Sequence, residues 1–136
     1  LFYHTTNLYT QESLIKDYCK DLFNHNYVTK DFYKSVLQRM KSSGTYIARG
    51  IALPHGSKDF VQKSVISLIH LKKPILWDNE ITDLVILVAI NDDDAKNYSY
   101  LFRKIMRIAS NDDLSKKLKH CTADEQLYEL LNKVSL

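Results

Sequence analysis

The chain has 136 residues, of which 45% are hydrophobic and 26% are charged, and its formal net charge is +3. We expect residues 1–136 to form a single domain with its own core, cut from a larger multidomain protein because the chain begins at Leu1. The mild positive charge, without clustered arginines, does not favour nucleic-acid binding, and no apolar run is long enough to span a membrane.

The first part of the chain predicts a short strand followed by two amphipathic helices. A strand is expected over residues 1–3, and Thr10 is a suitable N-cap for a helix whose apolar residues recur on one face. Thr29 is expected to cap the second helix, which ends at the small residues 42–44. Residues 45–54 then favour extended backbone with turns.

The middle of the chain predicts two strands of a sheet. Residues 64–71 are rich in branched apolar side chains, and this run is too short for a convincing helix. Residues 84–90 are almost continuously apolar, which is typical of a central strand covered on both faces. We expect residues 72–83, which include the only tryptophan, to connect the two strands.

Three further helices are expected in the C-terminal part. The first carries apolar side chains at helical spacing over residues 98–106, the second over 114–118 and the third over 127–131. Thr122 and Glu125 have the spacing of a capping box at the start of the last helix. Together the elements predict an α/β fold in which helices on both faces sandwich a small mixed β-sheet.

The sequence gives no sign of a metal or disulfide site. Cys19 and Cys121 form no CxxC pair, and we expect both to be reduced thiols of a cytoplasmic protein. The acidic stretch 92–94 lacks the alternating spacing of a calcium loop. We therefore expect neither a metal nor another cofactor.

The segment Leu53-Pro54-His55-Gly56 carries the strongest chemical signal. Proline favours extended backbone at the residue before it, and glycine permits a sharp turn after the histidine. The His55 imidazole is thereby presented at a strand end as a nucleophile, and phosphoryl transfer suits a neutral imidazole near pH 7. Taken alone, however, the Pro-His-Gly tripeptide more often marks an ordinary turn histidine.

A phosphorylated imidazole requires hydrogen-bond donors or a cation beside it. The upstream candidates are Arg39, Thr45 and Arg49. The chain contains neither a GxxxxGK[ST] nor a GxGxxG motif, which are the signatures of nucleotide sites. We therefore expect the phosphoryl group to arrive on another phosphorylated molecule.

Residues 39–56, RMKSSGTYIARGIALPHG, resemble the signature of the type-2 enzyme IIA (EIIA) domains of the bacterial sugar phosphotransferase system, mannitol and fructose class. The resemblance extends over nearly the whole chain. It implies that His55 accepts phosphate from the phosphocarrier protein HPr and passes it to an enzyme IIB (EIIB) domain. It also implies that Arg39 holds the phosphoryl group and that Thr45 assists, whereas Arg49 falls in the family's variable loop and takes no role.

Two positions depart from the family pattern. Met40 stands where a glutamate commonly follows the arginine, so an anchor for Arg39 is missing. Transport members often carry a second histidine at the start of the helix after the central strand, and Tyr98 aligns with that position. The missing histidine is typical of copies of this domain at the C-terminal end of sugar-operon regulators of the BglG and mannitol-activator type.

Three functions stay open at this point. The favoured one is a phospho-acceptor domain that regulates a transcriptional activator or antiterminator through the charge added at His55. The second is a transport EIIA that relays phosphate from HPr to an EIIB, which would make the chain a phosphotransferase component. The third is an interaction module that is not phosphorylated. We expect no direct contact with nucleic acid or a membrane, and the oligomeric state, a homodimer included, stays open.

Overall fold

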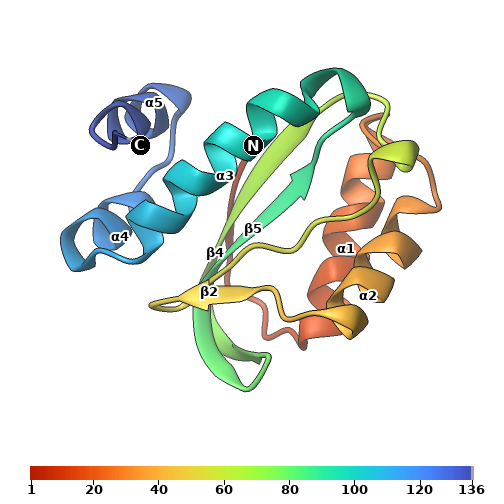
Figure 1. Cartoon of the computed structure of the whole chain (residues 1–136). Coiled ribbons are helices and arrows are strands. Elements are labelled where there is room, and N and C mark those ends of the chain that lie inside the picture. Colours follow the sequence, from red (N-terminus) through yellow and green to blue (C-terminus); the bar gives the residue numbers. More distant parts are fainter. Residues whose placement is uncertain (136) are drawn as a thin grey trace.

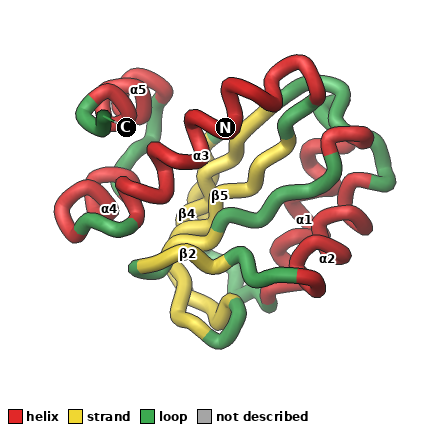
Figure 2. Tube along the Cα trace, in the orientation of Figure 1, coloured by secondary structure: helices red, strands yellow, loops and turns green. Residues whose placement is uncertain are grey.

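The computed structural model of the chain describes residues 1–135. Its strands are β1 (Phe2–Thr5), β2 (Tyr46–Ala48), β3 (Ile51–Ala52), β4 (Val65–Trp77) and β5 (Glu80–Ala89). Its helices are α1 (Gln11–Asn24), α2 (Phe32–Ser42), α3 (Ala95–Ala109), α4 (Asp112–Lys119) and α5 (Asp124–Asn132), with short 3-10 turns η1 (Lys58–Phe60) and η2 (Asp92–Asp94). The strands form one sheet in the order β1-β4-β5-β3-β2. Helices α1 and α2 cover one face, and α3 to α5 lie on the other (Figure 1, Figure 2).

The sheet is mixed, and its central strand explains the long apolar run. Strand β5 pairs antiparallel with β4 and parallel with β3, while β1 joins β4 in parallel at the far edge. Along β5, Val85 and Leu87 contribute to the core beneath α1 and α2, whereas Ile86 and Val88 contribute to the core beneath α3 to α5. Because both faces are covered, no position in this stretch needs a polar side chain. The predicted α/β fold with helices on both faces of a mixed sheet is confirmed.

The expected connection over residues 72–83 is wrong, because most of it belongs to a long β-hairpin. Strand β4 continues to Trp77 and β5 begins at Glu80, so Asp78 and Asn79 alone form the turn. Their φ angles of 51° and 67° match a two-residue turn in which both central residues are left-handed, a conformation that Asp and Asn tolerate.

Two of the three predicted helix caps are also wrong. Thr10 caps α1 as expected, since its hydroxyl accepts a hydrogen bond from the Ser13 backbone N–H. Helix α2, however, begins after Asp31, and Thr29 only offers its backbone carbonyl to Phe32. Helix α5 has Ala123 at its N-cap position without a side-chain cap.

The C-terminal helices are tied to the sheet by a buried histidine. The Nε2 atom of His70 on β4 lies 3.1 Å from the carbonyl oxygen of Cys121, between α4 and α5. Cys121 and Cys19 are both free and buried. In the described residues 1–135, no helix is long and apolar enough to cross a membrane, and no cluster of His, Cys, Asp or Glu is arranged to hold a metal ion.

Candidate functional site

His55 lies where the chain runs from β3 alongside the central strand. The Pro54 carbonyl accepts a hydrogen bond from the Val88 backbone N–H of β5 at 3.0 Å, and His55 forms a parallel bridge with Val88. On the other side, the Leu53 N–H donates to the Thr45 carbonyl at 2.8 Å. Backbone hydrogen bonds therefore hold the segment before His55 from two directions, and the predicted position at a strand end agrees with the structure.

Gly56 is needed for close packing and not for a turn. Among the described glycines only Gly50 has a positive φ, so Gly56 adopts ordinary backbone geometry. A Cβ atom at Gly56 would lie 2.6 Å from Ser35 Oγ, 2.7 Å from Phe32 Cε1 and 2.9 Å from Val36 Cγ2, all on α2. The missing side chain thus allows the His55 segment to lie directly against that helix.

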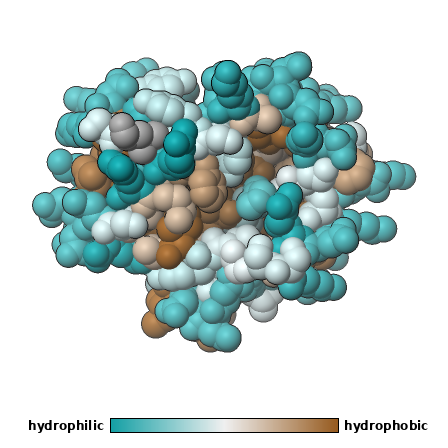
Figure 3. Space-filling model, in the orientation of Figure 1, coloured by the Kyte–Doolittle hydropathy of each residue, from teal (hydrophilic) through white to brown (hydrophobic). Residues whose placement is uncertain are grey.

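The His55 ring opens into a cleft of about 310 Å³ between α2, η1 and the start of α3. Its lining comprises Arg39, His55, Gly56, Ser57, Lys58, Val88, Ile90, Ala95 and Tyr98. A hollow beside it is lined by His55, Tyr98, Ser99, Phe102 and Arg103. In the space-filling view, apolar residues gather in a hollow near the centre of the viewed face, with polar residues around it (Figure 3).

Within the described residues 1–135, one ring nitrogen of His55 has a hydrogen-bond contact and the other has none. Its Nδ1 atom lies 3.3 Å from the Leu53 carbonyl oxygen, and a carbonyl can only accept, so Nδ1 carries the proton. Nε2 then keeps its lone pair. Burial lowers the pKa of His55, and the Arg39 guanidinium lowers it further, while the bond to Leu53 acts in the opposite direction. The ring is therefore neutral at pH 7, as a nucleophile must be.

Two of the three predicted site residues lie together, and the third does not line the cleft. Arg39 is exposed in the last turn of α2 and lines the cleft with His55. Thr45 is buried, and its hydroxyl accepts a hydrogen bond from the indole Nε1 of Trp77 at 2.7 Å. Its predicted assistance to the phosphoryl group stays a prediction, whereas its hydrogen bonds to Trp77 and Leu53 support the backbone that leads to His55.

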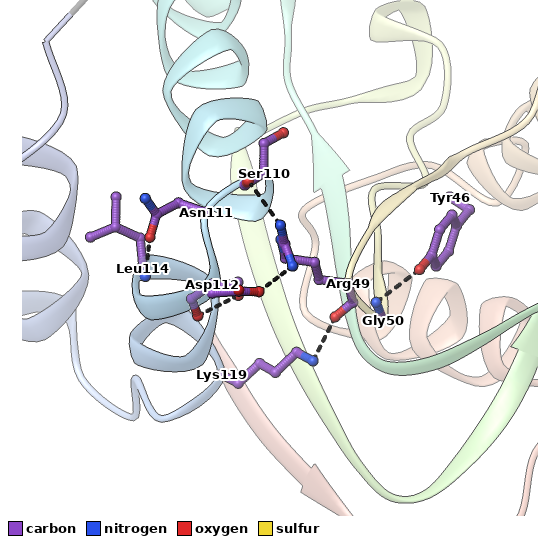
Figure 4. Close-up of polar contacts among 9 residues, drawn as sticks. Tyr46, Arg49, Gly50, Ser110, Asn111, Asp112, Leu114 and Lys119 are labelled. Carbon is purple, nitrogen blue, oxygen red and sulfur yellow. Dashed lines mark hydrogen bonds and ion pairs between the residues drawn. The ribbon is translucent and has the colours of Figure 1, made fainter.

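Arg49 serves a separate polar cluster, which Figure 4 shows. It has a φ of 52° in the turn between β2 and β3, and its guanidinium forms an ion pair with Asp112 at the start of α4. Its carbonyl oxygen accepts a hydrogen bond from Lys119 Nζ at 2.6 Å, at the end of the same helix. Arg49 therefore joins the edge of the sheet to α4, and it does not line the His55 cleft.

Two basic residues near His55, Lys58 and Arg103, were not predicted from the sequence. Lys58 lines the cleft and pairs with Asp92 at 2.7 Å, and Arg103 lines the neighbouring hollow. Asp92 offsets the charge of Lys58, so Arg39 and Arg103 supply the excess positive charge of the rim, which suits an anionic group. Lys58 stands three residues after His55 in the sequence, and this short separation is the only signal that could have indicated it.

Comparisons with known proteins agree with the geometry. Residues 2–134 match the family model described as phosphoenolpyruvate-dependent sugar phosphotransferase system, EIIA 2. The transcriptional regulator ManR of Bacillus subtilis is 33% identical over 105 residues, which are 77% of this chain and 16% of the regulator. The multiphosphoryl transfer protein of Escherichia coli O157:H7 is 26% identical over 125 residues, 89% of this chain and 32% of that protein. The chain thus spans only a minor part of the length of these relatives.

A solved structure shares the fold. The complex of enzyme IIAMTL and phosphorylated enzyme IIBMTL from Escherichia coli matches with a TM-score of 0.76 at 22% identity. The match covers 98% of this chain and 94% of that one. At this identity the likeness demonstrates a common fold.

Proposed function

Because the chain belongs to the EIIA type 2 family of the phosphoenolpyruvate-dependent sugar phosphotransferase system, we propose that it is a phospho-acceptor domain, modified on His55 by phospho-HPr. The observation that carries this proposal is the state of His55. Its ring is neutral and half-buried, with Nδ1 bound to the Leu53 carbonyl and the Nε2 lone pair without a partner among the described residues, in a cleft that Arg39 also lines.

The proposed reaction is an in-line displacement at phosphorus. The lone pair of His55 Nε2 forms a bond to phosphorus while the bond between phosphorus and the donor protein breaks, and the electron pair of that bond leaves with the donor. Nδ1 keeps its proton throughout, so no general base is needed. Such a transfer depends on positioning and charge neutralisation. The backbone bonds at Leu53 and Pro54 supply the positioning, and Arg39 supplies the charge.

A regulatory role is favoured over a transport relay. The similarity to the regulator ManR reaches 33% identity. Tyr98, which the family resemblance aligns with the second histidine of transport members, lines the cleft beside His55. Phosphorylation would then act through the negative charge it adds, with an EIIB domain as a further partner. The transport alternative draws support from the similarity to a multiphosphoryl transfer protein and from the fold shared with a IIA protein bound to phosphorylated IIB.

The test is phosphorylation in a reconstituted system. The chain is incubated with enzyme I, HPr and labelled phosphoenolpyruvate, and acid-labile label is measured on the wild type, on His55→Ala and on His25→Ala. His25 is an exposed histidine after α1 and serves as the control. We expect label on the wild type and on His25→Ala only. Label that survives in His55→Ala refutes the site, and an unlabelled wild type favours the interaction module.

A second measurement separates the regulator from the relay. Phosphorylated protein, freed of enzyme I and HPr, is mixed with EIIB domains of the mannitol and fructose class. A regulatory domain is expected to keep its label for longer than a transport EIIA of the same class treated in parallel. Rapid and complete transfer at the rate of the transport EIIA would instead assign the chain to the relay.

A further inference from the structure

A buried hydroxyl without a partner lies beside the proposed phospho-acceptor. The Tyr98 hydroxyl oxygen is buried and forms no hydrogen bond with any of the described residues 1–135. Buried hydroxyls in native proteins are normally paired, and an unpaired one carries a free-energy penalty. Tyr98 is one of two residues, with His55, that line both the cleft and the neighbouring hollow. The Tyr98 side chain therefore borders the space into which His55 opens, and its unpaired hydroxyl oxygen lies buried beneath that surface.

The position of the Tyr98 ring is fixed by its own helix. Phe102 follows four residues later on α3, and the two rings meet edge to face with centroids 5.7 Å apart and an interplanar angle of 63°. The ring is thus held by packing, and no hydrogen bond to its hydroxyl contributes. The hydroxyl itself has no competing partner among the described residues, so its donor capacity is unused.

The environment also fixes the hydroxyl as a donor. Burial raises the pKa of Tyr98 to about 12, and the Arg39 guanidinium acts in the opposite direction. The hydroxyl keeps its proton throughout the physiological range, so it can donate to an anion without losing its own proton. The effect of Arg39 on both Tyr98 and His55 shows that the three side chains share one electrostatic environment.

We propose that the Tyr98 hydroxyl donates a hydrogen bond to the phosphoryl group on His55 and so stabilises the phosphorylated state. This inference rests on the proposed function of His55. The phosphoryl group brings acceptor oxygens to a cleft-lining side chain whose buried donor has no partner among the described residues. Arg39 supplies a positive charge from an exposed position, whereas Tyr98 supplies a neutral, buried and directional bond. The two contributions differ in their response to salt, because screening weakens the interaction of exposed charges much more than that of buried groups.

The test compares Tyr98→Phe with Tyr100→Phe. Tyr100 is 51% exposed on the same helix, so its variant is a matched loss of one hydroxyl outside the cleft. The equilibrium of His55 phosphorylation with HPr is measured for each. We expect Tyr98→Phe to lower the equilibrium constant about tenfold, at low and at high salt alike, on the scale of one hydrogen bond to a charged acceptor. Tyr100→Phe is expected to match the wild type.

Two further readouts separate this role from mere packing. The unmodified Tyr98→Phe protein should melt no lower than the wild type, because the change removes an unpaired buried hydroxyl. In the phosphorylated wild type, we expect the Tyr98 hydroxyl proton to appear in NMR spectra coupled to phosphorus, a measurement that needs no variant. If the wild type is labelled on His55 but Tyr98→Phe has the same equilibrium constant, or the coupling is absent, this inference fails alone. If the wild type takes no label, the proposed function fails first.

Discussion

Replacing Gly56 by alanine tests whether the His55 segment lies as close to α2 as the structure shows. The added methyl group would lie 2.6 to 2.9 Å from atoms of Phe32, Ser35 and Val36, whereas carbon atoms in good contact are about 3.5–4.0 Å apart. The segment must therefore move outward by about 1 Å. Overpacking of this kind costs about 1–3 kcal/mol. Unfolding of 136 residues has an entropy of about 0.29 kcal/mol/K, so the melting temperature should fall by about 4–10 °C.

The assay is thermal and denaturant unfolding of Gly56→Ala beside Gly44→Ala. A Cβ at Gly44 meets only the Asp78 side chain, at 3.3 Å and at an exposed position, so this control should stay within about 0.5 kcal/mol of the wild type. Displacement of His55 should also slow its phosphorylation, and a shift of about 1 Å can cost about a hundredfold in rate. A Gly56→Ala protein as stable and as readily phosphorylated as the control would refute the close approach.

Three further outcomes follow from the site and its supports. Arg39→Ala should slow phosphorylation by about tenfold or more, as expected for loss of a charge-assisted contact. The denaturant midpoint of unfolding should not change. If the variant unfolds instead, the role of Arg39 is structural. Trp77→Phe should lower the free energy of unfolding, measured in urea, by about 2–4 kcal/mol, because it leaves a cavity and removes the donor to the Thr45 hydroxyl. A loss below about 1 kcal/mol would contradict the buried contact. Burial lowers the pKa of His70 from 6.5, so the unfolded chain binds a proton first and stability should decline as the pH falls below 6.5. His70→Gln should flatten this decline, measured in a His55→Ala background because the pKa of His55 is lowered in the same way; an unaltered slope would exclude His70 as its source.

The elements with a strong hydrophobic period could be predicted from the sequence. Segments whose composition fits both a loop and an edge of a strand could not. The apolar run 84–90 and the helical spacing after it predicted β5 and α3 because burial on one or both faces decides those elements. The segment Lys72-Lys73-Pro74 has the composition of a loop, yet it lies on exposed positions of β4, where the pairing register shifts between His70 and Ile75. Such a shift accommodates a proline, and it depends on a partner strand that composition does not reveal.

Site residues that lie close together in the sequence could be predicted from motifs. Residues that the packing of distant elements brings to the site could not. The motif around His55 predicted a nucleophile and the family resemblance predicted Arg39 beside it; the two side chains do line one cleft, and their chemical roles stay predictions. Arg103 reaches the same region only because α3 packs beside β5, which no short motif encodes. The sequence predicted that Gly56 allows a sharp turn, whereas its lack of a side chain allows close packing against α2. That contact depends on the tertiary packing of α2, which the local sequence does not reveal.

The bridge between His55 and Val88 has a consequence for how a modification would be felt outside the domain. The backbone of the proposed acceptor is bonded to the central strand β5. Backbone in a sheet core is expected to open only with global unfolding, and its amide protons are expected to exchange slowly. If two negative charges are added to the His55 ring, the bonded main chain cannot shift locally to accommodate them. Under the proposed function, the change would be passed outward as an altered surface potential, which a partner would sense at the rim of the cleft.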